Sequence, residues 1–109
     1  MSICYNFTGK KKMQFILIAY DGTDSDALER RLKVRKEHLA KIEKMKEKGE
    51  FIAGGAILDD YGKMTGSMIV YELPDRKTLD DRLRDEPYFT TGVWKHVEIK
   101  PFRMAVMKQ

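Results

Sequence analysis

Several features that would place a protein in a membrane, in an oxidising compartment or around a metal ion are missing from this 109-residue sequence. Its one cysteine, Cys4, cannot form an internal disulfide, which agrees with a reducing compartment. No apolar run approaches the roughly 18 residues of a membrane span, and the N-terminus lacks the apolar core of a signal peptide. Neither metal-ligand spacing nor the nucleophile-elbow pattern of a hydrolase occurs. We therefore expect a cytoplasmic protein with no metal and no membrane partner.

The sequence does not predict a basic patch that would bind nucleic acid, although the formal net charge is +4 and 35% of the residues are charged. The lysines gather at positions 10–12 and 41–48, and glutamates are interspersed with the second group. Lysines in the last turns of a helix complement its dipole, so this pattern favours a solvated helix face over a nucleic-acid site. We expect no nucleic-acid partner and a single domain with its own core.

The stretch 24–49 is the most strongly patterned part of the chain and predicts one long helix. Capping residues lie at positions 24–26, and Gly49 follows a lysine-rich last turn, as is typical of a helix C-terminus. Arg35 falls in the middle of the apolar face, and Arg31 and His38 fall just beside it. That face is predicted from four residues at helical spacing: Leu28, Leu32, Leu39 and Ile42. Because burying an arginine is costly without an anionic or polar partner, the pattern predicts such a partner for Arg35.

Four strands and a second, shorter helix complete the predicted elements. Runs rich in β-formers predict strands over residues 14–20, 51–58, 64–73 and about 94–107, and the second helix is predicted over residues 75–84. Gly54 and Gly55 weaken the second strand, where a β-bulge is favoured over the close approach of a ligand or backbone. Met13 is a candidate start of translation. Residues 1–12 are therefore expected to be a disordered or peripheral extension of a single domain over residues 13–109.

The predicted order of elements is strand, helix, strand, strand, helix, strand. This is the order of the ferredoxin-like α+β fold, βαββαβ, in which two helices cover one face of an antiparallel sheet. The other face of that sheet would be bare. We therefore expect a homodimer that packs two open sheet faces together as a dimeric α/β barrel, or a higher oligomer.

Several dispersed motifs resemble those of the YCII-like family. The string from Leu32 to Leu39 is similar to the R-x-x-H-L signature of that family, with Arg35, His38 and Leu39 at its three fixed positions. Further motifs follow at family-like spacing: Gly49, Gly54-Gly55, Gly66-Ser67, Asp85-Glu86-Pro87-Tyr88, Gly92-Val93-Trp94 and Lys100-Pro101-Phe102. The resemblance spans residues 13 to about 105. It departs from the family pattern at Ala56, where many relatives have proline, and in the shorter loop 59–63.

The resemblance implies a dimeric α/β barrel of ferredoxin-like protomers, similar to muconolactone isomerase. It also implies an enzyme with a histidine and an aspartate in one pocket, which correspond to His38 and Asp85 in this sequence. One branch of the family includes a dehydrochlorinase, whereas most members have no assigned substrate. A histidine is the natural proton carrier near neutral pH, and an aspartate on its far nitrogen fixes the tautomer.

We therefore expect a cofactor-free isomerase or lyase in which His38 and Asp85 form a general acid–base pair acting on a small organic acid. Proton abstraction beside a carbonyl builds negative charge, which Arg35 or Arg31 would stabilise. The other expected substrate-binding residues are Ser67, Tyr88 and Trp94.

Structural roles stay open for each of these residues. His38 could be a hydrogen-bonded core residue, Asp85 a helix terminator and Arg35 a structural ion-pair partner. The aromatic residues could belong to the core or to the dimer interface. At the level of function, the rivals are a non-catalytic module that binds or senses a small ligand and a purely structural interaction domain.

Overall fold

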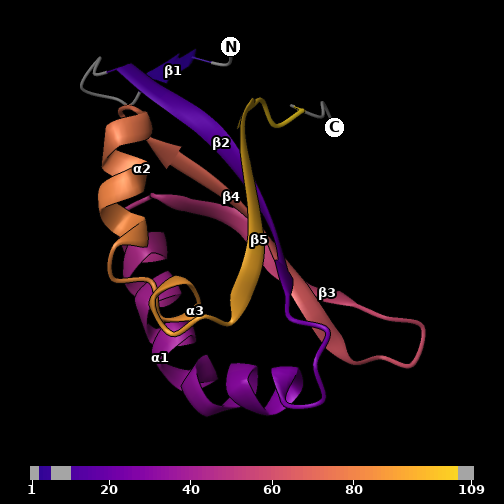
Figure 1. The fold of residues 1–109 in the computed structure, drawn as a ribbon. Coiled ribbons are helices and arrows are strands. Elements are labelled where there is room, and N and C mark those ends of the chain that lie inside the picture. The colour runs from indigo at the N-terminus through magenta and orange to yellow at the C-terminus, as the bar shows by residue number, and fades with distance from the viewer. Residues whose placement is uncertain (1–2, 6–10, 106–109) are drawn as a thin grey trace.

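The computed structural model describes residues 3–5 and 11–105 (Figure 1). The elements follow in the order β1 (Ile3–Tyr5), β2 (Lys11–Asp21), α1 (Ala27–Glu47), β3 (Phe51–Leu58), β4 (Met64–Leu73), α2 (Arg76–Leu83), α3 (Pro87–Thr90) and β5 (Trp94–Phe102). The predicted strands and the two main helices are all present. Two short elements, β1 and α3, are present in the structure but not predicted from the sequence.

All strand pairs of the sheet are antiparallel, and β2 lies at its centre between β4 and β5. β3 pairs with the outer edge of β4. β1 continues the β5 edge of β2, because Met13 pairs with Ile3 on one side and with Leu73 of β4 on the other. With β1 set aside, the order β5-β2-β4-β3 confirms the predicted ferredoxin-like α+β fold.

The core lies between the sheet and the helices, which cover the same face of the sheet (Figure 1). Alternate residues of β2, namely Phe15, Leu17 and Ala19, are buried on that face because successive side chains of a strand point to opposite sides. α2 contributes Leu79 and Leu83, which are four residues apart and therefore on one side of the helix. This packing fixes the layer against which α1 lies.

The helix ends follow the predicted chemistry only in part. The Asp75 side chain caps α2 by accepting the Thr78 backbone N–H at 2.8 Å, and Gly49 takes the positive φ of 74° that ends the α1 region. At the start of α1, Asp26 makes no side-chain cap bond. The carboxylate of Asp24 is bound by Arg30 instead.

The buried face of α1 differs from the predicted one. Two of the leucines expected to face the sheet are largely exposed, with Leu32 at 52% and Leu39 at 45%, and Arg35 is exposed as well. The helix is rotated so that a different stripe is inside: Ala27, Arg31, His38 and Met45. The prediction that Arg35 is buried in the core is therefore wrong. Arg31 and His38 are tolerated inside because each meets polar partners from other elements.

The glycine pair of β3 is not where the strand bulges. The irregularities of the β3–β4 register fall between Phe51 and Ala53 and between Ile57 and Leu58. Gly54 has a different reason, because a Cβ there would lie 2.7 Å from the Met68 backbone oxygen. The predicted bulge at Gly54 and Gly55 is therefore wrong.

The predicted extension and the predicted end of the last strand are described in part. Residues 3–5 form β1 at the edge of the sheet, and β2 begins at Lys11. β5 ends at Phe102, and positions 106 and 107 of the expected strand lie outside the described residues. Among the described helices, none has the length and apolar character needed to cross a bilayer.

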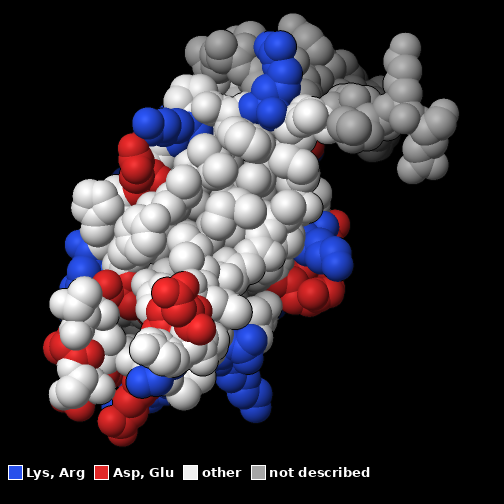
Figure 2. All heavy atoms as spheres, turned by 90° about the vertical axis from the view of Figure 1, so that its right-hand side faces the viewer, with Lys and Arg blue, Asp and Glu red and all other residues white. Residues whose placement is uncertain are grey.

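The face of the sheet away from the helices carries no covering element among the described residues. Ile16, Ile18 and Met68 alternate with the core residues and point to this side. Figure 2 shows the side of the molecule turned away from the helices, and its central area is free of Lys, Arg, Asp and Glu. Charged side chains lie around that area.

Candidate functional site

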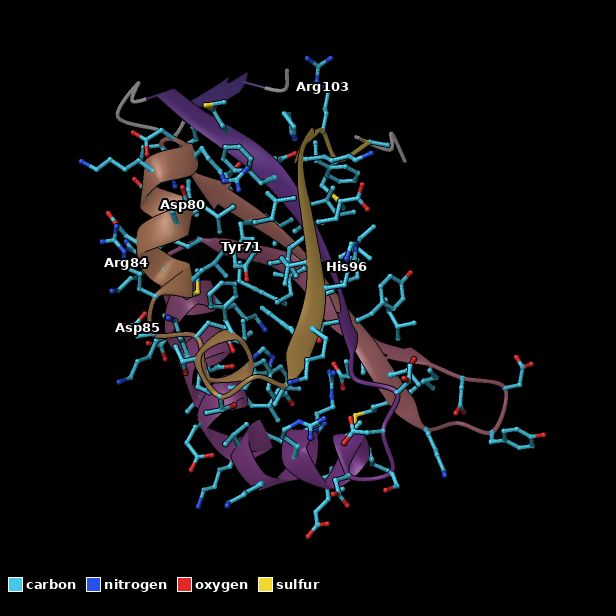
Figure 3. The ribbon with its side chains drawn as sticks, viewed as in Figure 1. Tyr71, Asp80, Arg84, Asp85, His96 and Arg103 are labelled. Carbon is cyan, nitrogen blue, oxygen red and sulfur yellow. The ribbon has the colours of Figure 1, made fainter. Side chains whose placement is uncertain are left out.

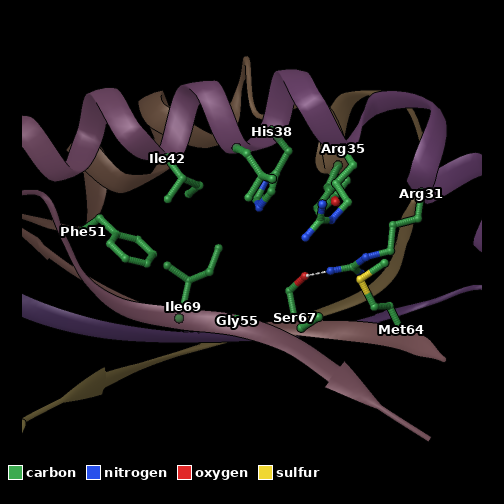
Figure 4. A pocket seen from close by; sticks show the side chains of 13 residues that line it. Arg31, Arg35, His38, Ile42, Phe51, Gly55, Met64, Ser67 and Ile69 are labelled. Carbon is green, nitrogen blue, oxygen red and sulfur yellow. Dashed lines mark hydrogen bonds between the residues drawn. The ribbon is translucent and has the colours of Figure 1, made fainter. Parts of the chain in front are cut away.

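A cavity of about 140 Å³ lies between α1 and the β3–β4 part of the sheet. Its volume is close to that of an engineered cavity that admits benzene, so it can hold one six-membered ring. In Figure 4, His38 and Arg35 point from α1 toward the sheet, and Ser67 and Ile69 point from β4 toward α1. One end is lined by apolar side chains: Leu39, Ile42, Phe51 and Ile69. The other end is polar and is lined by Arg31, Arg35, His38 and Ser67.

His38 forms a buried pair with Glu86. Nδ1 of His38 lies 2.5 Å from Oε1 of Glu86, and the two side chains are 10% and 2% exposed. Glu86 is the N-cap of α3, and the same oxygen accepts the Tyr88 backbone N–H at 3.1 Å. A carboxylate on Nδ1 fixes the ring so that Nε2 is the nitrogen left for chemistry, and it stabilises an imidazolium.

Burial and the charge of Glu86 also raise the pKa of the Tyr71 phenol (Figure 3).

Tyr88 is the aromatic wall behind the histidine. Its ring stacks on that of His38 with centroids 3.9 Å apart and an interplanar angle of 15°. The Arg31 guanidinium lies 4.5 Å from the centroid of the same tyrosine ring, within cation–π range. Burial raises the pKa of the Tyr88 phenol, while the charges of Arg31 and Arg35 oppose this rise. The stack limits the rotation of the imidazole at the cavity wall.

Arg31 is 3% exposed and links three elements. Its Nη1 donates to both carboxylate oxygens of Asp21 at 3.0 Å, and its Nη2 donates to Oγ of Ser67 at 2.9 Å. Trp94 donates its indole N–H to the same serine oxygen at 3.1 Å. The charge of Arg31 is therefore balanced inside the protein by Asp21.

Arg35 is different, because it makes no ion pair with any residue in the described part of the chain. It is exposed, yet it lines the polar end of the cavity. An unpaired guanidinium at a cavity mouth attracts an anionic group and can bind a carboxylate with two parallel hydrogen bonds.

Asp85 does not meet His38, so the predicted pairing of these two residues is wrong. Its side chain is 82% exposed and binds the Lys41 ammonium, which also donates to the Arg82 carbonyl. Lys41 accordingly holds the pKa of the Asp85 carboxyl below its usual range. Figure 3 shows Asp85 near the end of α2, at the outside of the molecule. Glu86 is the carboxylate that turns inward, because it caps α3.

Five of the seven predicted site residues line the cavity: Arg31, Arg35, His38, Ser67 and Tyr88. Trp94 is buried and contacts the site through its hydrogen bond to Ser67, and Asp85 lies outside it. His96, the other histidine, is exposed on β5 (Figure 3).

Two carboxylates that bind side chains of the site, Asp21 and Glu86, are not predicted from the sequence. Leu17 and Ala19 are alternate buried residues of β2, and Asp21 is the next residue in this alternation. The alternation of a strand therefore predicts that the Asp21 carboxylate points inward. Glu86 directly precedes Pro87, and proline is favoured at the first position of a helix. That pair of residues is the signal of an N-cap.

The chemistry open to this site is proton transfer beside a bound anion. Within residues 3–5 and 11–105, no three His, Cys, Asp and Glu side chains gather as a metal site requires. A buried imidazole with a carboxylate behind it can take a proton from a substrate and return it. Arg35 and the donors around Ser67 can stabilise the negative charge that forms on the substrate.

Comparisons with known proteins agree with one another. A family model described as the YCII-related domain matches residues 13–103. Protein YciI of Escherichia coli O6:H1 is 32% identical over 97 residues, which cover 84% of this chain and 97% of that protein. An uncharacterized protein of Haemophilus influenzae is 28% identical over the same length and with the same coverage.

Among solved structures, 5-chloro-2-hydroxyhydroquinone dehydrochlorinase of Burkholderia phenoliruptrix, in complex with 2,5-dihydroxybenzoquinone, has a TM-score of 0.74 to this chain. Its sequence identity is 22%, and the match covers 85% of this chain and 96% of that one. A conserved protein of Methanosarcina mazei matches with a TM-score of 0.52 and 18% identity, covering 85% of this chain and 94% of that one. These likenesses establish the shared fold.

Proposed function

The chain belongs to the family of YCII-related domain proteins, and we propose that it is a cofactor-free enzyme that moves a proton on a small acidic substrate. The reaction class is elimination or isomerisation. His38 is the general acid–base residue, and Glu86, in place of the expected Asp85, is the carboxylate that orients it. The buried contact between His38 and Glu86 at the wall of a ring-sized cavity is the observation that carries this proposal.

The substrate follows from the two ends of the cavity. A ring or short unsaturated chain fits against the apolar end, and an ionised oxygen fits near Arg35 at the polar end. The structurally similar dehydrochlorinase binds 2,5-dihydroxybenzoquinone, a ring with oxygen substituents that matches these requirements. A hydroxylated, chlorinated ring is therefore the first substrate to test.

In an elimination on a chlorinated hydroquinone, His38 takes the proton of one ring hydroxyl and delivers it to the chlorine-bearing carbon. Loss of a second hydroxyl proton to the same histidine then expels chloride, so that HCl is lost and a quinone forms. In an isomerisation, the same histidine returns the proton at a second carbon. Negative charge collects on the substrate oxygen in both cases, and Arg35 stabilises it. A positioned acid–base group contributes a rate factor of about 10² to 10⁴.

The test compares paired variants on 5-chloro-2-hydroxyhydroquinone, with chloride release as the measurement. His38→Ala is expected to lose about 10²-fold or more in kcat, whereas His96→Ala removes the exposed histidine and serves as the matched control. The parent protein could bind 2,5-dihydroxybenzoquinone and yet turn over neither 5-chloro-2-hydroxyhydroquinone nor a muconolactone. That result would favour the rival function, a ligand-binding module. Equal turnover by the parent and His38→Ala would refute the catalytic role.

We also propose that the chain assembles as a homodimer through the open face of its sheet. The uncharged central area of that face supports the proposal (Figure 2), because a sheet with one apolar face bare is more stable when that face is covered. Light scattering measures the mass directly, and a monomer at micromolar concentration would contradict this assembly.

A further inference from the structure

The hydroxyl of Ser67 is placed between two groups that can only donate hydrogen bonds. Ser67 is 2% exposed on the helix-facing side of β4. Its Oγ accepts Nη2–H of Arg31 at 2.9 Å and the indole N–H of Trp94 at 3.1 Å. Guanidinium and indole nitrogens carry hydrogens and offer no acceptor, so the direction of both bonds is fixed.

A hydroxyl has two acceptor sites and one hydrogen. Arg31 and Trp94 occupy both acceptor sites of Ser67, so this serine can take part in a further bond only as a donor. No acceptor for its hydrogen is present in the part of the chain that the structure describes. Nε of Arg31 is a second buried donor without a partner in the same range. Buried donors left without acceptors are unfavourable, so a ligand that brings an acceptor gains binding free energy there.

The cavity is where such an acceptor can enter, because Ser67 and Arg31 both line it. Figure 4 shows the serine pointing up from β4, across the cavity from His38 and Arg35. We infer that Ser67 is an obligate hydrogen-bond donor to the substrate, oriented by Arg31 and Trp94, and that the cavity selects a carbonyl, carboxylate, phenolate or enolate oxygen at this position. The inference rests on the proposed function and adds that the substrate must place a hydrogen-bond acceptor next to β4.

The two donors also change the chemistry of the serine. Hydrogen bonds in a chain polarise one another, and Arg31 is charged, so the Ser67 O–H becomes a stronger donor than an ordinary strand serine. A donor fixed in place before the reaction stabilises negative charge as it forms on a substrate oxygen. A ligand whose group at this position can only donate, such as an ammonium, would place two donors against each other and is rejected.

The test measures binding of 2,5-dihydroxybenzoquinone and of benzoate by calorimetry. Fluorescence of Trp94, the one tryptophan of the chain, is a second signal for the variants that keep this residue. Ser67→Ala is expected to bind at least one of the two probes about 10- to 100-fold more weakly than the parent does. Ser67→Thr keeps a hydroxyl on the same carbon and is expected to retain most of the parent's affinity for the probe. Trp94→Phe removes one donor from Ser67 but leaves the serine hydrogen, so its loss is expected to be about threefold. Circular dichroism melting of each variant monitors folding.

The outcomes separate this inference from the proposed function. Equal binding by the parent and Ser67→Ala, equal losses in the alanine and threonine variants, or a loss in Trp94→Phe as large as that in Ser67→Ala would each overturn the inference. Serine-dependent binding without any turnover would support the inference and overturn the proposed catalysis. Turnover that depends on His38 but not on Ser67 would do the reverse. A parent protein that binds neither probe would overturn both.

Discussion

Replacing Glu86 by glutamine, with Asp85→Asn as the matched control, tests which of two neighbouring carboxylates supports the histidine. Glu86 is 1% exposed, and one of its oxygens accepts from both His38 and the Tyr88 backbone. Glutamine keeps an acceptor oxygen but loses the charge and brings an amide N–H₂ into a buried position. Hydrogen bonds to a charged group contribute about 1.5–3 kcal/mol each, so we expect Glu86→Gln to lower the free energy of unfolding by about 2–3 kcal/mol.

The control has a much smaller expected effect. Asp85 pairs with Lys41 at the surface, and exposed ion pairs contribute about 0–1 kcal/mol after screening by solvent and salt. For a domain of this size, about 1 kcal/mol corresponds to roughly 4 °C in Tm. Glu86→Gln should therefore lower Tm by about 8–12 °C and Asp85→Asn by less than about 4 °C.

The assay is urea and thermal unfolding at pH 7 and one fixed protein concentration, because dimerisation would make Tm depend on concentration. Turnover is measured on the same preparations, and Glu86→Gln is expected to lower kcat by about 10²-fold because the imidazole loses its orienting carboxylate. A larger loss of stability or turnover in Asp85→Asn than in Glu86→Gln would refute the pairing. That result would support Asp85 as the partner of His38, which is the role that the family resemblance implies.

Three further predictions test the surroundings of the site. Arg82 lowers the pKa of Glu50 below its ordinary value of 4.5. Their ion pair therefore stabilises the fold above that pH and loses its effect as the pH falls through the lowered pKa. The difference in unfolding free energy between the parent and Glu50→Gln, measured by urea unfolding, should be about 1 kcal/mol at pH 7 and should vanish at low pH. Ile18→Lys places an ammonium on the open sheet face, opposite a glutamate of β5, and light scattering should show a monomer if that face is the dimer interface. Gly54→Ala should lower stability by about 1–3 kcal/mol because its Cβ would meet a backbone oxygen of β4, whereas the Cβ of the control Gly55→Ala meets nothing within 4 Å and should change stability by less than about 1 kcal/mol.

The order of the main elements and the bounds of β3 and β4 are predictable because their signals are local. Phe51–Leu58 and Met64–Leu73 form β3 and β4 with the predicted bounds, since Gly49 and a turn at 59–63 delimit them. The Asp75 cap marks α2 in the same way. α3 is missing from the prediction because four residues cannot show a helical period.

The rotation of α1 could not be predicted from the apolar pattern alone. The stripe with more leucines would be inside if burial depended on hydrophobicity alone, yet Arg31 and His38 are inside instead. Their partners lie far away in the sequence: Asp21, Ser67 and Glu86 are 10, 36 and 48 residues from the side chains that they bind. A stripe of polar residues becomes favourable only when such partners are in place, and no local signal reports them.

Whether Asp85 or Glu86 points inward depends on which of these two neighbours directly precedes α3. The helix α2 ends at Leu83, so Asp85 lies in the exposed connection and finds Lys41. Pro87 begins α3, and the carboxylate before it turns toward the free backbone N–H groups of its own helix, which also brings it under His38. The inward carboxylate is therefore the one fixed by a helix cap.

The inward stripe of α1 carries a cost that the fold alone would not require. A helix that only covered this sheet could bury aliphatic residues in place of Arg31 and His38, and such replacements of buried ion pairs are often neutral or stabilising. Each of these two side chains instead engages a carboxylate, and together they leave donors and an imidazole facing one cavity. The partners come from the end of β2, from β4 and from the cap of α3, so no single element could place them. Arg35, which the apolar pattern places in the core, remains outside this network. It lies at the cavity mouth and forms no ion pair with any residue that the structure describes. A polar interior arranged around a ring-sized space is more readily explained by ligand chemistry than by stability.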